Sequence, residues 1–85
     1  MPSTYRTLKM IRHATATKAA ELIWSEIIPG HHQADYLGMC LEVELAFNDR
    51  WTVFDVNGDV WLEGRCRGLA DGRVKAFNAL KAEIQ

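Results

Sequence analysis

The clearest pattern in the chain is an alternation of apolar and polar positions between residues 37 and 47. Successive side chains of a β-strand point to opposite faces, so this pattern predicts a strand with one buried and one solvated side. The expected buried side consists of Leu37, Met39, Leu41, Val43, Leu45 and Phe47, and the expected solvated side consists of Cys40, Glu42, Glu44 and Ala46.

Two further strands are predicted at 51–56 and 60–66, on either side of Asn57-Gly58. Asn-Gly between two apolar runs is a strong hairpin signal, because both residues tolerate the positive φ of a two-residue type I′ turn. Such a turn would place three pairs of residues opposite each other: Val56 and Asp59, Phe54 and Trp61, and Val53 and Leu62.

A three-residue loop at 48–50 is expected to join the first of these strands to the second, with Phe47 opposite Trp51 and Leu45 opposite Val53. A loop of two or four residues would turn the apolar side of the hairpin towards water. With the three-residue loop, the core side holds Leu41, Val43, Leu45, Val53, Val60 and Leu62. The outer side then holds Glu42, Glu44, Thr52, Phe54, Asp59, Trp61, Glu63 and Arg65.

A helix is predicted in the N-terminal part of the chain, about 4–28, centred on the run KAAELIWSEII. Either Thr15 or Thr17 could cap this run, because a threonine oxygen accepts a hydrogen bond from an unpaired backbone N–H. Pro29-Gly30 is expected to end it. The segment 4–13 suits either a helix or a strand, and 31–36 is expected to be a polar loop.

A second helix is predicted at about 70–84. Asp71 is the expected N-cap, with a start at Gly68 as the alternative. Its apolar edge is expected to consist of Val74, Phe77, Leu80 and Ile84. Together with the three strands at 37–66, these elements predict a single α+β domain. We expect a two-layer αβββα fold in which both helices cover one face of a three-stranded antiparallel meander.

The charges are segregated along the chain, although the formal net charge is only −1. Residues 1–20 carry four basic and no acidic residues, 21–64 carry nine acidic residues and one arginine, and 65–85 carry five basic and two acidic residues. The ends could attract the middle within the fold, or the chain could present two surfaces of opposite charge to partners.

The two cysteines, Cys40 and Cys66, allow at most one disulfide bond. No apolar run reaches the length of a membrane span or of the core of a signal peptide. We therefore expect reduced thiols, a cytoplasmic location and no membrane association.

No residue pattern predicts an enzyme. Glu42 and Glu44 share the outer side of one strand, and an open sheet offers no pocket for acid–base chemistry. His31 and His32, followed by Asp35, are the best metal candidates, but adjacent histidines point in different directions in most backbones. We expect no cofactor and no metal, and zinc binding by the two histidines stays a separate hypothesis.

The outer side of the sheet is the predicted binding surface, because a large aromatic residue within a polar rim is typical of interfaces. The partner-binding residues are expected to be Phe54, Trp61, Glu42, Glu44, Asp59 and Glu63. Their charge would favour a basic protein partner, and a second copy of the chain could also dock on this open face.

The stretch FDVNGDVWLEGRCRGLADGRVKAFNALKAEI, together with the small size of the chain, resembles small phage-encoded anti-defence proteins, of which anti-CRISPR proteins are the best known. This resemblance implies an inhibitor that binds a nucleic-acid-handling protein in the host cytoplasm.

The predicted order of helix, three strands and helix is similar to the double-stranded RNA-binding domain. That resemblance implies duplex RNA binding by basic residues in and near the two helices. The residues concerned are Lys18, Arg65, Arg67, Arg73 and Lys75.

Overall fold

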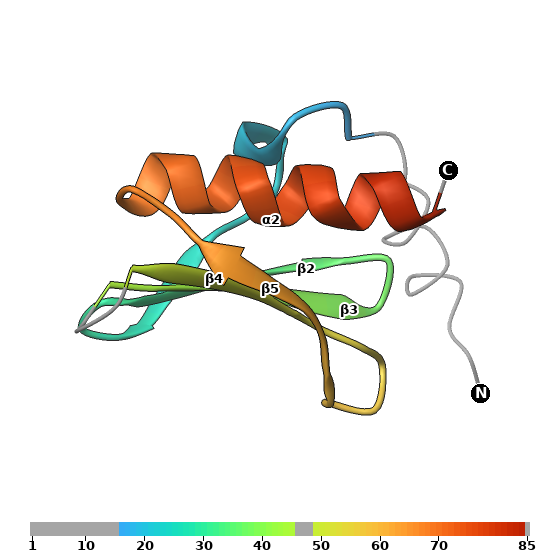
Figure 1. Cartoon of the computed structure of the whole chain (residues 1–85), viewed down its shortest axis with the longest axis horizontal. Coiled ribbons are helices and arrows are strands. Elements are labelled where there is room, and N and C mark those ends of the chain that lie inside the picture. The colour runs from blue at the N-terminus through green and yellow to red at the C-terminus, as the bar shows by residue number, and fades with distance from the viewer. Residues whose placement is uncertain (1–15, 46–48, 85) are drawn as a thin grey trace.

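The computed structural model describes residues 16–45 and 49–84, which form a five-stranded antiparallel sheet with one α-helix across one face (Figure 1). The elements are the 3₁₀ turn η1 (Ala19–Glu21), β1 (Ser25–Ile28), β2 (His31–Tyr36), β3 (Met39–Glu44), β4 (Arg50–Phe54), β5 (Val60–Arg65) and α2 (Leu69–Ile84). The strands lie in the sheet in their order along the chain. The α+β class and the antiparallel sheet are confirmed, whereas the αβββα layout with two helices is wrong.

The segment predicted as the first helix contains no α-helix in its described part, residues 16–28. A 3₁₀ turn, η1, is followed by strand β1 where the predicted helix would have continued. Ile27 and Ile28 are β-branched, which favours extended backbone. Pro29-Gly30 therefore connects two strands instead of ending a helix. The segment 4–13 lies outside the described residues.

The segment 31–36, predicted as a loop, is strand β2 and contributes to the core. Ala34 and Tyr36 are buried on the side of α2. Leu37 and Gly38, with φ of 55° and 83°, form the two-residue connection to β3. The conformation expected at Asn57-Gly58, with two successive positive φ values, therefore occurs here instead.

The hairpin around Asn57-Gly58 is confirmed, but its turn is one residue longer than predicted. Gly58 N–H donates to the Asp55 carbonyl at 3.0 Å, and only Gly58 has a positive φ, at 88°. The Asp55 carboxylate also accepts hydrogen bonds from the backbone N–H groups of Asn57 at 2.9 Å and Asp59 at 3.0 Å. These bonds favour a three-residue loop over the type I′ turn.

The longer turn changes the pairing near the end of the hairpin. Val53 pairs with Leu62 as predicted, but the register then shifts and Phe54 pairs with Val60. The expected Phe54–Trp61 pair is therefore wrong. Val60, expected in the core, shares the outer side with Phe54 and is exposed.

The connection between β3 and β4 is longer than the predicted three-residue loop. Leu41 pairs with Val53, and Val43 pairs with Trp51, so the predicted pairing of Leu45 and Phe47 with β4 is wrong. Each of these β4 residues pairs with a β3 residue four positions earlier than predicted, and an even shift keeps each side chain on its predicted face. Leu41, Val43 and Val53 are therefore fully buried, as expected. Phe47 itself lies outside the described residues.

The C-terminal helix is confirmed, although its start and its buried stripe differ from the prediction. It begins at Leu69, so Asp71 lies in the first turn, where its carboxylate accepts a hydrogen bond from Arg67 N–H at 2.8 Å. The buried residues of α2 are Gly72, Ala76, Phe77 and Leu80, whereas Val74 and Ile84 are exposed. Within 16–45 and 49–84, no helix is long and apolar enough to cross a membrane.

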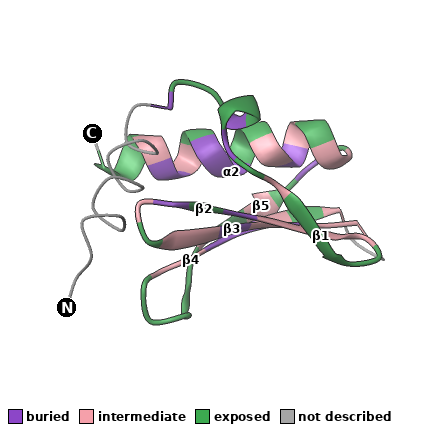
Figure 2. Cartoon of the chain, turned by 180° about the vertical axis from the view of Figure 1, so that it is seen from behind, coloured by how far each residue is buried: buried purple, intermediate pink, exposed green. Residues whose placement is uncertain are grey.

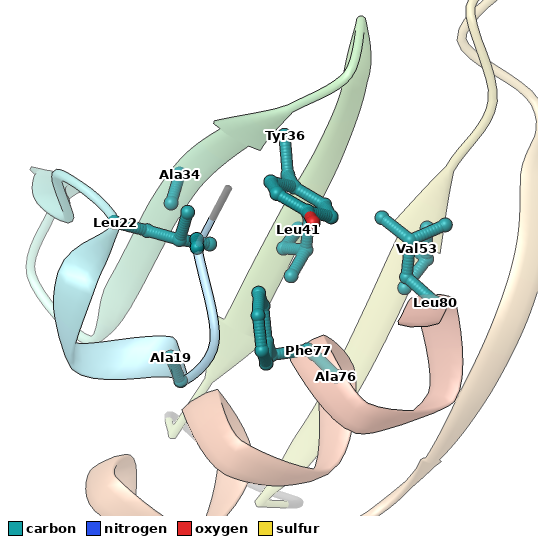
Figure 3. Close-up of a cluster of buried hydrophobic side chains, with 10 residues drawn as sticks. Ala19, Leu22, Ala34, Tyr36, Leu41, Val53, Ala76, Phe77 and Leu80 are labelled. Carbon is teal, nitrogen blue, oxygen red and sulfur yellow. The ribbon is translucent and has the colours of Figure 1, made fainter. Parts of the chain in front are cut away.

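The core lies between the sheet and α2. Figure 3 shows side chains from η1, three strands and the helix meeting in one cluster. At its centre, the ring centroids of Tyr36 and Phe77 are 5.2 Å apart, and the two ring planes are tilted by 57°. No described element covers the opposite face of the sheet (Figure 1).

Candidate protein-binding face

The face of the sheet opposite α2, called the open face below, is assembled from alternate residues of four strands. The register places twelve side chains on it: His31, Gln33 and Asp35 of β2; Cys40, Glu42 and Glu44 of β3; Arg50, Thr52 and Phe54 of β4; and Val60, Glu63 and Arg65 of β5. Figure 1 shows the β4–β5 hairpin projecting beyond the sheet on this same side.

Ion pairs and hydrogen bonds link the centre of the open face across four strands. His31 lies between two carboxylates, with Nδ1 at 3.5 Å from Glu42 Oε2 and Nε2 at 3.2 Å from Glu44 Oε2. Arg50 continues the chain, with Nε at 3.9 Å from Glu44 Oε1 and Nη2 at 3.3 Å from Glu63 Oε1. Gln33 Nε2 donates a hydrogen bond to Glu42 Oε2 at 3.3 Å. The linked residues are called the charged network: His31, Gln33, Glu42, Glu44, Arg50 and Glu63.

The structure brings together three of the four acidic residues predicted as partner-binding residues. Glu42, Glu44 and Glu63 belong to the charged network, whereas Asp59 lies in the hairpin turn, exposed. Arg50 contacts both Glu44 and Glu63 and offsets part of their charge. Exposed ion pairs of this kind contribute little to stability, about 0–1 kcal/mol.

Three members of the charged network were not predicted from the sequence to lie on the open face. His31 and Gln33 were assigned to a loop, and Arg50 was assigned to a turn. A usable signal was present in 31–36, where Ala34 and Tyr36 alternate with polar residues. That alternation is typical of a half-buried strand.

The two aromatic residues predicted to bind the partner do not form a cross-strand pair. Phe54 is half-buried on the open face, beside Val60. Trp61 lies at the register shift and is 41% exposed. Val56, Val60 and Trp61 are the exposed large apolar residues of the β4–β5 hairpin, and we call them the hairpin patch.

A shallow depression of about 220 Å³ lies at the other end of β5, lined by Arg50, Glu63, Gly64 and Arg65. Arg50 and Arg65 are directly opposite each other in the β4–β5 register. Two like charges in this arrangement repel, and Glu63 partly offsets that repulsion through its contact with Arg50.

The basic residues of the RNA-binding hypothesis are spread over several elements. Lys18 precedes η1, Arg65 ends β5 on the open face, and Arg67 lies in the connection to α2. The guanidinium of Arg73 lies 5.2 Å from the centre of the Trp24 ring, and Lys75 Nζ is 2.9 Å from Asp71 Oδ2. The last two side chains are therefore already engaged within the fold.

The two adjacent histidines lie on opposite sides of the sheet. His31 belongs to the charged network on the open face. His32 pairs with Glu26, with Nε2 at 3.5 Å from Glu26 Oε2. Within 16–45 and 49–84, no group of three or more His, Cys, Asp or Glu residues is arranged to hold a metal ion.

Neither cysteine is poised for nucleophilic chemistry, and both are free thiols. Burial, together with the nearby carboxylates of Asp35 and Glu42, raises the pKa of the Cys40 thiol to about 11. Burial also raises the pKa of Cys66. The thiolate is the reactive form, so both side chains are protonated and unreactive near neutral pH.

The fold and this surface define a small α+β protein with a helix on one side of a five-stranded meander and a charged, solvated face on the other. Comparisons with protein-family models, curated proteins and solved structures found no match.

Proposed function

We propose that this chain is a non-enzymatic interaction protein that binds a basic protein partner through its open face. The observation that carries the proposal is the uncovered sheet face itself. Acidic residues outnumber arginines there, and the hairpin that carries the exposed hairpin patch projects on the same side of the sheet (Figure 1). Acidic groups would steer a basic partner towards the face, and Trp61 would supply a contact that excludes water.

The resemblance to small phage-encoded inhibitors adds a biological setting to this proposal. A basic groove that holds nucleic acid is the kind of surface an acidic face could occupy. The partner is then a nucleic-acid-handling protein of the host, and the outcome of binding is inhibition in the host cytoplasm.

The proposal is tested with the full chain immobilised and exposed to a bacterial lysate, followed by calorimetry with the purified captured protein. Trp61→Ala is expected to weaken binding by about 2 kcal/mol, which is roughly thirtyfold in affinity. The variant should remain folded, because the indole is 41% exposed. An affinity equal to that of the original chain, or unfolding seen by circular dichroism, would contradict the assigned role of Trp61.

A matched pair of charge variants tests the electrostatic part of the proposal. Glu42→Gln combined with Glu44→Gln should slow association and reduce its dependence on salt. Glu83→Gln removes an exposed acid from α2 and should change neither quantity.

Duplex RNA binding is the competing function, and a gel shift at low and moderate salt separates the two. Retardation of duplex RNA that is lost on replacing Arg65 and Arg67 with glutamate would favour the RNA-binding function. No retardation at low salt would remove it.

A further inference from the structure

A second unpartnered surface lies at the β1 edge of the sheet. All four residues of β1 are exposed, and Figure 2 shows the strand in the colour of exposed residues along its length. Ile23, Ile27 and Ile28 are 76%, 50% and 55% exposed. They are three of the eight exposed large apolar residues of the described chain, and they fall within six consecutive positions.

The backbone of β1 is also unpaired on one side. The strand pairs with β2 and has no neighbour on its outer edge among the described residues. An edge strand of this kind can pair with another chain through its free N–H and C=O groups. The one charged side chain of β1 is that of Glu26, which accepts a hydrogen bond from Gly30 N–H at 3.2 Å and contacts His32.

The opposite edge of the sheet is better protected against pairing. Strand β5 carries two exposed charged side chains, Glu63 and Arg65, whereas β1 carries only Glu26. The register is irregular in both strands, between Glu26 and Ile28 in β1 and at Trp61 in β5, so the better protection of β5 comes from its charged side chains. Addition of β1 to the β5 of another copy, which would grow without limit, is therefore disfavoured.

We infer that β1 pairs antiparallel with β1 of a second copy, about a twofold axis perpendicular to the sheet. The apolar set of Ile23, Ile27 and Ile28 is complementary to itself, and a twofold axis buries it in both copies at once. The result is a closed dimer with one continuous ten-stranded sheet. Both α2 helices lie on one side of this sheet, and both open faces lie on the other.

The contact is small, because β1 has only four residues. It is smaller than the interfaces of about 1,200–2,000 Å² that hold stable complexes together. We therefore expect a dimer that forms reversibly, with a dissociation constant of about 10–500 µM.

Sedimentation equilibrium of the full chain from about 5 µM to about 1 mM tests the inference. The average mass should rise from 9.6 kDa towards twice that value. Ile27→Lys should keep the protein monomeric over the whole range. The matched control is Val74→Lys on α2, where the exposed fraction is 49% compared with 50% at Ile27, and this variant should associate as the original chain does.

Hydrogen exchange at low and high concentration locates the contact. The amides of β1 should exchange more slowly at high concentration, and those of β5 should not change. A monomer at every concentration would overturn the inference. So would undiminished association of Ile27→Lys, or protection that falls on the open face or on α2 in place of β1.

Discussion

At Gly72, α2 lies close against Val43 of β3 and Cys66. A Cβ atom at this position would lie 2.6 Å from Val43 Cγ1 and 3.0 Å from Cys66 Sγ. Val43 is fully buried and β-branched, so it has little freedom to move away. Glycine is therefore required here by space, although it weakens the helix.

Gly72→Ala is expected to destabilise the protein by about 1–2 kcal/mol, because overpacking outweighs the gain in helix propensity. Urea unfolding measures the change. Asn78→Ala is the control, since Asn78 is exposed on the same helix and the substitution should be neutral or slightly stabilising. A Gly72→Ala variant as stable as the original chain would show that Val43 and Cys66 can move apart.

Asp55 determines the turn of the β4–β5 hairpin through its side chain. Asp55→Ala removes two hydrogen bonds to backbone N–H groups and should cost about 1–2 kcal/mol in urea unfolding. Asp59→Ala is the control, because its carboxylate makes no hydrogen bond or ion pair within 16–45 and 49–84. Equal stability of the two variants would contradict the role of Asp55.

At the level of elements, the start of α2 makes stability depend on pH. Asp71 forms a salt link with Lys75 and accepts a hydrogen bond from Arg67 N–H, and both contacts hold the pKa of Asp71 below its usual range. A carboxyl whose pKa is lowered by folding stabilises the folded state at pH values above its unfolded pKa, near 3.9. That contribution is lost as the pH falls through the folded pKa.

Asp71→Asn should therefore reduce stability at neutral pH and flatten the fall in stability as the pH drops below about 4. Thermal unfolding across this range measures both effects. Glu83→Gln, at the other end of the helix, is the control and should leave the curve unchanged. An Asp71→Asn curve parallel to that of the original chain would contradict this account.

Some elements could be predicted from the sequence because their patterns permit one interpretation. The alternation in β3 and the Asn-Gly hairpin identified three neighbouring strands of the sheet, β3, β4 and β5, and the even register shift between β3 and β4 preserved the faces. The helix predicted for the run before Pro29 is wrong, because a short apolar stretch fits a helix or a strand equally well. Its outcome depends on β2, whose Tyr36 packs against Phe77.

The candidate site could be predicted only where it depends on a single strand. The sequence predicted that Glu42 and Glu44 share one face, because this follows from the alternation within one strand. Their contact with His31 was not, since it requires the β2–β3 register, which is settled by the two-residue turn at Leu37-Gly38. The pairing of Phe54 failed for a similar reason, because the Asp55 side chain selects a longer turn.

At the scale of the whole molecule, the two sides of the sheet have separate roles. The side of α2 supplies the core, and substitutions there should act on stability. The open face holds the charged network, whose half-buried and exposed ion pairs lie outside the core, and substitutions there should act on binding. The β1 edge is a third surface, so a partner on the open face and a second copy at β1 could be bound together.

The order of the strands also bears on how quickly the chain reaches this structure. Each strand pairs with its neighbour in the sequence, and every connection between strands is short. Loops of this length close at small entropic cost, and proteins dominated by local contacts fold faster than those that join distant segments. The contact between Lys81 Nζ and the Ala16 carbonyl, at 3.2 Å, spans 65 positions and can form only after the two layers meet. The meander can therefore assemble strand by strand before the ends of the described chain are brought together over it.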